Sequence, residues 1–190
     1  MSDQSYPKLL FGRTGLWIAF LWGAAEATLF FVVPDVFLTL VALFSFRDSA
    51  KTLAAILAGA LLGGSVLYVA GERAPESARS VVLRVPFVSA SMVAKTRQDL
   101  EQAGIWIMVT KPRPGIPYKV YAVQAGRYSR FSTFLLASAL ARVERFAPFW
   151  IVAGLAGLIF RRTVVLYPRR AVAVHAALWI AGYAWYWITI

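Results

Sequence analysis

Six ionisable side chains lie in or beside strongly apolar stretches of the chain, where a charge is unusual. Two are acids and four are cations: Glu26 and Asp35, and Arg113, Lys119, Arg142 and Arg145. An unpaired charge in a bilayer costs at least about 2.5–3.5 kcal/mol, so ionisable residues in such segments indicate a functional site by default. Acids and cations that pair with one another offset much of this cost. These six residues are therefore the candidates for a site.

The two types of charge suit different chemistry. Arginine binds phosphate oxygens through its planar fork, so the four cations are candidates for holding an anionic headgroup. A carboxyl group beside such a cluster can gain and lose a proton, so Glu26 and Asp35 are candidates for proton-linked or ion-pairing acids. The same residues also suit ion pairs that only fasten two segments together. The residue types do not separate these two hypotheses.

The second group of charges begins in a proline-rich stretch. Residues 111–119 read KPRPGIPYK, between the apolar runs 105–109 and 120–123. Each proline removes a backbone donor and clashes with the preceding helical turn, and lipid does not tolerate the unpaired backbone that results. The stretch predicts the tip of a re-entrant hairpin whose cations face a polar pocket, and a short proline-rich loop outside the membrane is the alternative. The residues that break the helix are Pro114, Gly115 and Pro117.

The first group of charges lies in a similarly interrupted block. Residues 15–33 are long enough to cross a bilayer, but they contain Glu26 and are followed directly by Pro34 and Asp35. Residues 36–46 are too short to cross alone, so they predict a half-length element that folds back after Pro34, a residue that breaks the helix. A full span followed by an interfacial helix is the alternative. We expect residues 47–51 to form a polar loop.

The composition indicates an integral membrane protein. The chain has 190 residues, of which 59% are hydrophobic, whereas soluble domains are about 45–50% apolar. Its formal net charge of +11 suits cytoplasmic flanks and anionic lipid headgroups. The basic residues are scattered among apolar spans, which argues against nucleic-acid binding. Cysteine is absent, which excludes disulfides and thiolate chemistry.

The remaining segments predict further helices. Residues 52–71 are the clearest span and carry a face of small residues suited to close helix packing. Residues 89–102 predict a helix with a serine cap and a solvated face. Residues 131–160 are either one long tilted helix or two helices divided at Pro148. Residues 171–190 predict a final span whose aromatic end suits the headgroup layer.

No pattern in the chain indicates catalysis. His175 is the only histidine, so a histidine cluster that binds a metal is excluded, and a packed or interfacial histidine is the simplest interpretation. The chain contains no recognisable nucleophile–histidine–acid set, zinc motif or phosphate loop. We expect no enzymatic activity, no metal and no cofactor.

Several short motifs follow one another in a set order. The earlier ones are Glu26, the pair PD at 34–35 and GG at 63–64, and the later ones are IPYKV at 116–120, AG at 125–126 and RVERF at 142–146. Over residues 15–160 this order resembles the DedA superfamily, also called the VTT or SNARE-associated domain, and most closely its short YqaA-like branch. The chain departs from the family's common pattern at Asp35, where glutamate is commoner, and at 111–114, which read KPRP.

The resemblance implies an all-α, polytopic membrane protein with two opposed re-entrant hairpins and about three to five membrane-spanning helices. Members of the family are linked to the flipping of polyprenyl-phosphate lipids in bacteria, to phospholipid scrambling in eukaryotes and to the proton motive force. We therefore expect a flippase or scramblase of the bacterial inner membrane, whose partners are lipids with anionic phosphate headgroups and, as coupling ions, protons. A homo-oligomer is compatible with this expectation. A small-ion or proton-coupled solute transporter and a non-transporting scaffold are the alternatives.

The expected organisation has three parts. Residues 1–14 are a polar N-terminal segment, and residues 15–160 are the DedA-like membrane domain, with a polar or interfacial insert at 72–103. Residues 161–190 contain an arginine-rich connection and a C-terminal transmembrane helix.

Overall fold

The computed structural model describes residues 11–110 and 115–189, and its regular elements there are all α-helices. The expected all-α class is therefore confirmed for the described part of the chain. The helices are α2 (Arg13–Thr28), α3 (Asp35–Phe44), α4 (Phe46–Arg73), α5 (Pro75–Val82), α6 (Ala90–Ala103), α7 (Ile107–Thr110), α8 (Tyr118–Ala125), α9 (Phe131–Ile159), α10 (Arg161–Leu166) and α11 (Pro168–Thr189).

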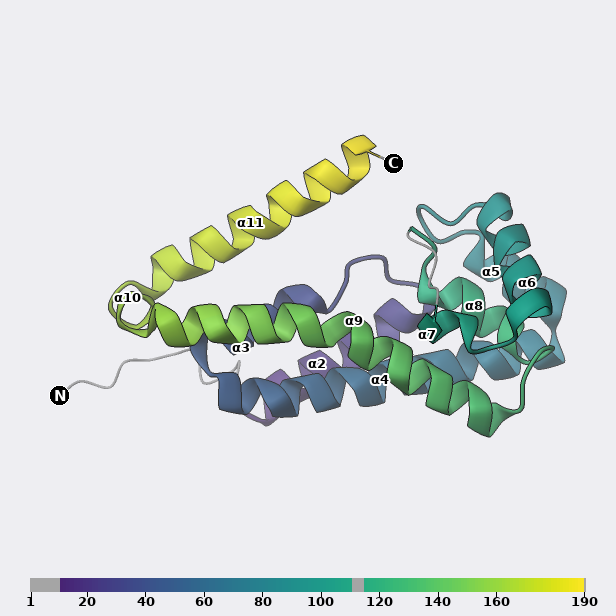
Figure 1. Cartoon of the computed structure of the whole chain (residues 1–190), viewed down its shortest axis with the longest axis horizontal. Helices are drawn as coiled ribbons and strands as arrows, with labels where there is room; N and C mark the ends of the chain where they lie inside the picture. The colour runs from purple at the N-terminus through teal and green to yellow at the C-terminus, as the bar shows by residue number, and fades with distance from the viewer. Residues whose placement is uncertain (1–10, 111–114, 190) are drawn as a thin grey trace.

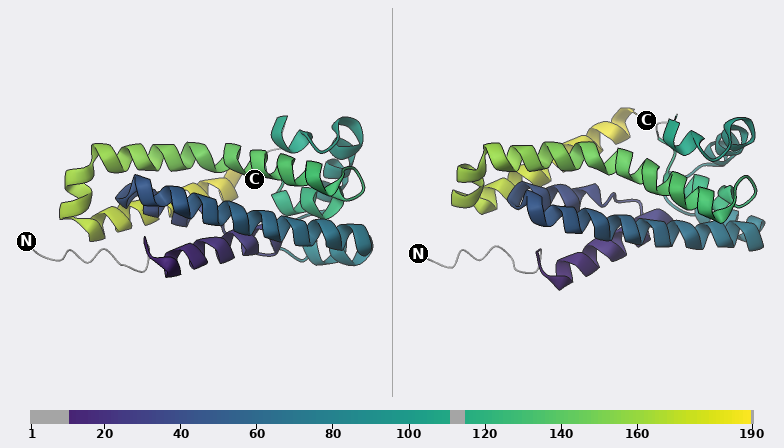
Figure 2. Two further views of the ribbon diagram at one scale, coloured as in Figure 1. Left: turned by 90° about the horizontal axis from the view of Figure 1, so that it is seen from below. Right: turned by 60° about the horizontal axis from the view of Figure 1, so that its bottom comes forward.

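Two long helices, α4 and α9, run along most of the length of the molecule (Figure 1). Helices α2 and α3 lie beside them, and the short helices α5 to α8 gather at one end, where α4 finishes and α9 begins (Figures 1 and 2). At the opposite end α10 turns the chain, and α11 runs back towards the short helices (Figure 1). The C-terminal helix therefore returns to the region in which both broken segments lie.

Helix α4 packs closely on α2 because glycines remove the side chains between the two helices. A Cβ atom on Gly23 would overlap the backbone of Ile56, and a Cβ atom on Gly59 would overlap the carbonyl group of Phe20. The small-residue face predicted within residues 52–71 is therefore confirmed as a packing face.

The first apolar block is interrupted, as the sequence predicts. Helix α2 ends at Thr28 instead of continuing to residue 33, and residues 29–34 form a non-helical connection that leads into α3. Pro34 is the N-cap of α3, which has only 10 residues. A short helix after Pro34 is therefore present as expected, whereas its folding back within a membrane, rather than lying at the interface after a full span, stays a prediction.

The prediction of a polar loop at residues 47–51 is wrong. Helix α4 already begins at Phe46, so these residues form its first turns. Ser45 Oγ accepts a hydrogen bond from the backbone N–H of Asp48 at 3.3 Å, and Asp48 places a negative charge in the first turn. Both features stabilise a helix start. Residues 47–51 are therefore helical in spite of their polarity, because the cap stabilises the start of α4.

Two other helices follow the sequence closely. Helix α9 continues through Pro148 as one element of 29 residues, which selects the undivided alternative for residues 131–160. Helix α6 begins after Ser89, whose Oγ accepts a hydrogen bond from the backbone N–H of Met92 at 3.3 Å. The predicted serine cap is therefore confirmed.

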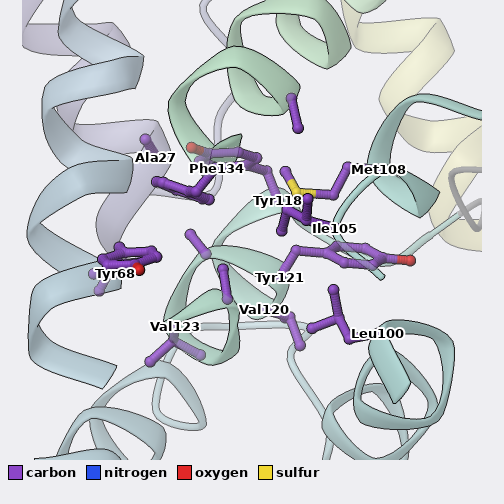
Figure 3. Close-up of a cluster of buried hydrophobic side chains, with 14 of the residues drawn as sticks. Ala27, Tyr68, Leu100, Ile105, Met108, Tyr118, Val120, Tyr121, Val123 and Phe134 are labelled. Carbon is purple, nitrogen blue, oxygen red and sulfur yellow. The ribbon is translucent and has the colours of Figure 1, made fainter. Parts of the chain in front are cut away.

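Helix α8 is short but deeply embedded. Val120 and Ala122 are fully buried, and they belong to an apolar cluster that also contains Tyr68 of α4, Leu100 of α6 and Phe134 of α9 (Figure 3). Packing on several sides compensates for the few backbone hydrogen bonds that so short a helix can make. The first turn of α8 is therefore held firmly in place.

Among the described helices, α4 is the one whose length and apolar composition suffice for crossing a membrane. Helix α9 is equally long but carries Arg142, Glu144 and Arg145 in its middle. The polytopic arrangement with two opposed re-entrant hairpins and three to five spans therefore stays a prediction, as does the division into three parts.

Candidate functional site

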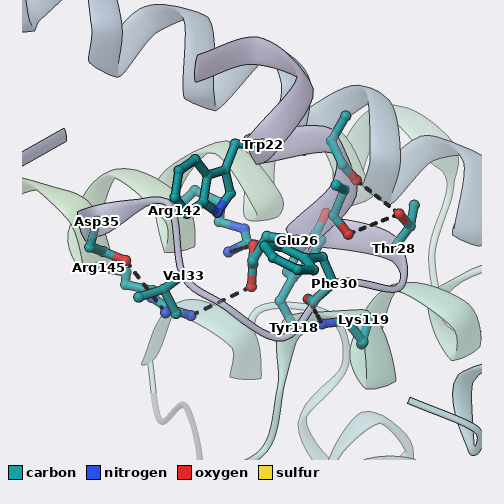
Figure 4. Close-up of polar contacts among 12 residues, drawn as sticks. Trp22, Glu26, Thr28, Phe30, Val33, Asp35, Tyr118, Lys119, Arg142 and Arg145 are labelled. Carbon is teal, nitrogen blue, oxygen red and sulfur yellow. Dashed lines mark hydrogen bonds and ion pairs between the residues drawn. The ribbon is translucent and has the colours of Figure 1, made fainter. Parts of the chain in front are cut away.

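Glu26 is the centre of a buried cluster of ion pairs (Figure 4). Arg142 Nη1 lies 2.8 Å from Glu26 Oε2, and Arg145 Nη1 lies 4.0 Å from Glu26 Oε1. Arg145 Nη2 also lies 3.6 Å from Asp35 Oδ2. Glu26, Asp35 and Arg142 are buried, whereas the Arg145 side chain is 39% exposed. Four of the six predicted charged residues therefore meet in one place.

Three helices position this cluster. Glu26 lies in the last turn of α2 and Asp35 is the first residue of α3, so the connection at residues 29–34 brings the two acids together. On α9, Arg142 and Arg145 are three residues apart and therefore share one face of the helix. The cluster joins the first broken segment to α9.

Hydrogen bonds with side chains hold the connection at residues 29–34, and two of these side chains are Trp22 and Tyr183. Trp22 Nε1 donates a hydrogen bond to the carbonyl oxygen of Val32 at 2.9 Å, and the backbone N–H of Val33 donates to the Tyr183 hydroxyl at 3.0 Å. Tyr183 lies on α11, 150 residues further along the chain. The non-helical backbone of the connection is thus partly satisfied by the C-terminal helix.

Lys119 connects the second broken segment to the first. Its Nζ donates a hydrogen bond to the carbonyl oxygen of Phe30 at 3.0 Å, and the residue is only 2% exposed (Figure 4). No ion pair joins Lys119 to a carboxylate in the described part of the chain. A buried ammonium group without an acidic partner is costly, so this lysine is a strong candidate for binding an anion.

Both broken segments line one cavity of about 490 Å³. Its charged lining residues are Glu26, Asp35, Lys119 and Arg145. The aromatic lining residues come from the first connection, from the connection between α5 and α6, and from α9 and α11: Phe31, Phe87, Phe149, Trp179, Tyr183 and Tyr186. The cavity therefore combines a charged region with largely aromatic walls.

The electrostatic balance of this site favours an anion. Lys119, Arg142 and Arg145 outnumber Glu26 and Asp35 by one charge among the described residues of the site. Helices α3 and α8 also begin at the cavity, and the N-terminus of a helix carries a partial positive charge. The side chains and the helix N-termini therefore both favour a negatively charged ligand.

The predicted helix-breaking residues are described in part. Arg113 and Pro114 lie outside the described residues. Gly115 has a φ of +79°, which a residue with a side chain rarely adopts, and Pro117 is the extended N-cap of α8. Both of these residues line the cavity, so the break in the second segment contributes to the site.

His175 has a packing role. Its Nε2 lies 2.9 Å from Thr39 Oγ1, and Trp179 Nε1 donates a hydrogen bond to the same oxygen at 3.0 Å. These contacts fasten α11 to α3. The interpretation of His175 as a packed histidine is therefore confirmed.

Several aromatic residues of the site were missed by the sequence reasoning. Trp179, Tyr183 and Tyr186 were expected in the headgroup layer, but they line the cavity. The Arg142 guanidinium carbon lies 3.9 Å from the centre of the Tyr118 ring, a contact that no pattern predicted. The one sequence signal for Tyr118 was its position directly before Lys119.

Comparison of the chain with protein-family models, with curated proteins and with solved structures finds no match.

Proposed function

We propose that this chain is an integral membrane protein that moves lipids with an anionic phosphate headgroup between the two leaflets of a bilayer. The observation that carries the proposal is the shared cavity, in which buried Lys119 has no acidic partner among the described residues and lies beside the pairs formed by Glu26 and Asp35. Both interrupted segments contribute to this cavity. Broken helices that meet around a binding site are a recurring feature of membrane transporters.

The exposed surface supports insertion into a membrane. Many large apolar side chains are exposed on the described helices, and extensive exposed apolar surface is unusual in soluble monomers. They include Trp17 and Leu21 on α2, Leu62 on α4, Val152 on α9, and Leu178 and Ile180 on α11. Two of the three charges of α9 are paired with buried acids, which lowers the cost of placing this helix in a membrane.

In this proposal the headgroup binds beside Lys119 and Arg145. Arg142 is occupied by Glu26, whereas Arg145 is partly exposed and makes longer contacts with its acids. A cavity of about 490 Å³ is in the size range of small-molecule sites. It accommodates a headgroup and part of a chain, and the aromatic walls suit the chain. Arg113 belongs to the same proposal through its place in the sequence.

Glu26 and Asp35 are the proposed proton-linked acids. Both are buried beside a cation, so protonation of either acid would loosen its ion pair. The order of motifs that resembles the DedA superfamily supports coupling to the proton motive force and a place in the bacterial inner membrane.

The test is lipid flipping in proteoliposomes that contain a fluorescent phosphate-headgroup lipid, read by the fraction of dye that an impermeant quencher reaches. We expect wild-type protein to flip the lipid and the double variant Glu26→Gln, Lys119→Ala to be inactive. The matched control is Glu76→Gln, Lys95→Ala, which removes the same charge types from exposed positions on α5 and α6. Equal rates for wild type and the site variant would refute the proposal.

The alternatives give different results in the same preparation. A solute carrier would transport a small ion or solute without flipping lipid. A scaffold would show neither activity, and Glu26→Gln would lower its melting temperature without any transport defect.

A further inference from the structure

Tyr118 lies against the central ion pair of the site. It is the first residue of α8 and is 9% exposed. The guanidinium carbon of Arg142 lies 3.9 Å from the centre of the Tyr118 ring, well inside the distance of about 6 Å at which a cation is attracted by a ring face. The next ring, Phe146, is 5.7 Å away. Tyr118 is therefore the principal aromatic partner of Arg142.

Arg142 has few other partners for a buried cation. Its one acidic contact is Glu26, and its Nε and Nη2 have no hydrogen-bond partner within the described ranges 11–110 and 115–189. A guanidinium group with so few polar contacts would be expensive to bury. The face of the Tyr118 ring supplies attraction that the missing hydrogen bonds do not.

The ring itself is held from three sides. The Tyr118 hydroxyl donates a hydrogen bond to Ser138 Oγ at 3.0 Å, one turn before Arg142 on α9. The Phe134 ring stacks on Tyr118 with centres 6.5 Å apart. On α4, a Cβ atom on Gly64 would overlap the Tyr118 hydroxyl, so a glycine there leaves the space that the ring needs. The orientation of the ring is therefore determined by its surroundings.

We propose that Tyr118 is a positioning residue that acts through Arg142. The ring face holds the guanidinium group against Glu26 and so keeps the Arg142–Glu26 ion pair together. The inference rests on the proposed function in one respect, which is that Glu26 is taken as a proton-linked acid of the site. It goes beyond that function by adding an aromatic residue from α8 to a cluster of charges from α2, α3 and α9.

Labelling with a hydrophobic carbodiimide, which attacks protonated carboxyl groups in apolar surroundings, tests the inference without any lipid substrate. Modification of Glu26 is quantified by peptide mass spectrometry at one neutral pH. We expect Tyr118→Leu to label Glu26 about tenfold faster than wild type, because the lost ring contact weakens the pair. Tyr118→Phe keeps the ring face and should label at the wild-type rate. Arg142→Gln is the positive control.

Two further measurements separate positioning from a loss of packing. Leu100→Ala removes a buried side chain of α6 from the same apolar cluster, so it should label like wild type even where its melting temperature falls. Fluorinated phenylalanines at position 118 weaken the attraction of the ring face for the Arg142 cation and change the shape of the ring little. The labelling rate of Glu26 should therefore rise with each added fluorine. The proposal is overturned if labelling shows no such trend, or if Tyr118→Phe labels as fast as Tyr118→Leu. Because no lipid is present, a negative flipping assay leaves this result intact.

Discussion

Two arginines of the same helix face have different environments. Arg142 is buried and lies 2.8 Å from Glu26, whereas Arg145 is 39% exposed and makes contacts of 3.6 and 4.0 Å. A buried pair is costly to break, because the remaining charge stays in the interior without a partner. A partly exposed pair is screened by its surroundings. The two residues should therefore contribute differently to stability.

We predict that Arg142→Gln lowers the free energy of unfolding by about 3–5 kcal/mol. Arg145→Gln should lower it less, by about 1–3 kcal/mol, because Arg145 is partly exposed and its contacts are longer, although buried Asp35 loses its cation. Chemical unfolding in detergent measures both effects. The double variant Glu26→Gln, Arg142→Gln should regain part of the loss, because it removes both charges of this pair and leaves neither of them buried alone. Equal losses for the two arginine variants would contradict the geometry.

Lys119 should show the opposite behaviour. It is buried without an acidic partner in the described part of the chain, so its charge opposes folding. We predict that Lys119→Met leaves the melting temperature unchanged or raises it, while binding of a lipid phosphate is lost. Lys95→Met, at an exposed position, is the control and should alter neither quantity. A lower melting temperature for Lys119→Met would indicate a structural role.

At the scale of elements, the glycine contacts between α2 and α4 leave no space for a methyl group. A Cβ atom on Gly59 would overlap the Phe20 carbonyl, whereas a Cβ atom on Gly182 of α11 would meet nothing within 4 Å. We predict that Gly59→Ala lowers the free energy of unfolding by about 1–3 kcal/mol through overpacking. Gly182→Ala should be neutral or stabilising, because alanine is the better helix former. Thermal unfolding compares the two, and similar behaviour would argue against the close packing.

The elements show how far the sequence could predict the fold. The short helix α3 could be expected from Pro34, and the possibilities for α9 could be reduced to one helix or two. Both are possible because the effects of proline and of segment length are local. The start of α4 was missed although Ser45, three residues before Asp48, is a helix-start signal in the sequence, because the polarity of residues 47–51 was given more weight. Charged residues in apolar segments identified the ion-pair cluster. The aromatic wall from α11 could not be predicted, because it depends on contacts between residues such as Val33 and Tyr183, 150 positions apart.

At the scale of the whole molecule, α11 is tied to the rest by a small set of polar contacts around α3 and the first connection. Tyr183 accepts the hydrogen bond of the Val33 N–H, and Thr39 is bonded by His175 and Trp179. Each such bond contributes about 0.5–1.5 kcal/mol net. The position of α11 is therefore sensitive to single polar substitutions.

We predict that Tyr183→Phe increases hydrogen exchange in residues 29–34 and in α11, because the Val33 N–H loses its acceptor. The matched control is Tyr167→Phe, at a half-exposed tyrosine between α10 and α11, which should leave exchange unchanged. Exchange measured by mass spectrometry in detergent or lipid discs gives the comparison. Unchanged protection of both segments in Tyr183→Phe would show that this bond does not hold α11.

The position of α11 at the end of the chain has a consequence for the cavity, because three aromatic residues of this helix line it. Glu26, Asp35 and Arg142 all precede α11 in the chain, so their ion pairs can form before the ribosome has made the last helix. Trp179, Tyr183 and Tyr186 then complete the cavity as the final step of assembly. Until that step the charged region is open on one side, and in the function proposed above this side is where a lipid would enter without any gate having to open.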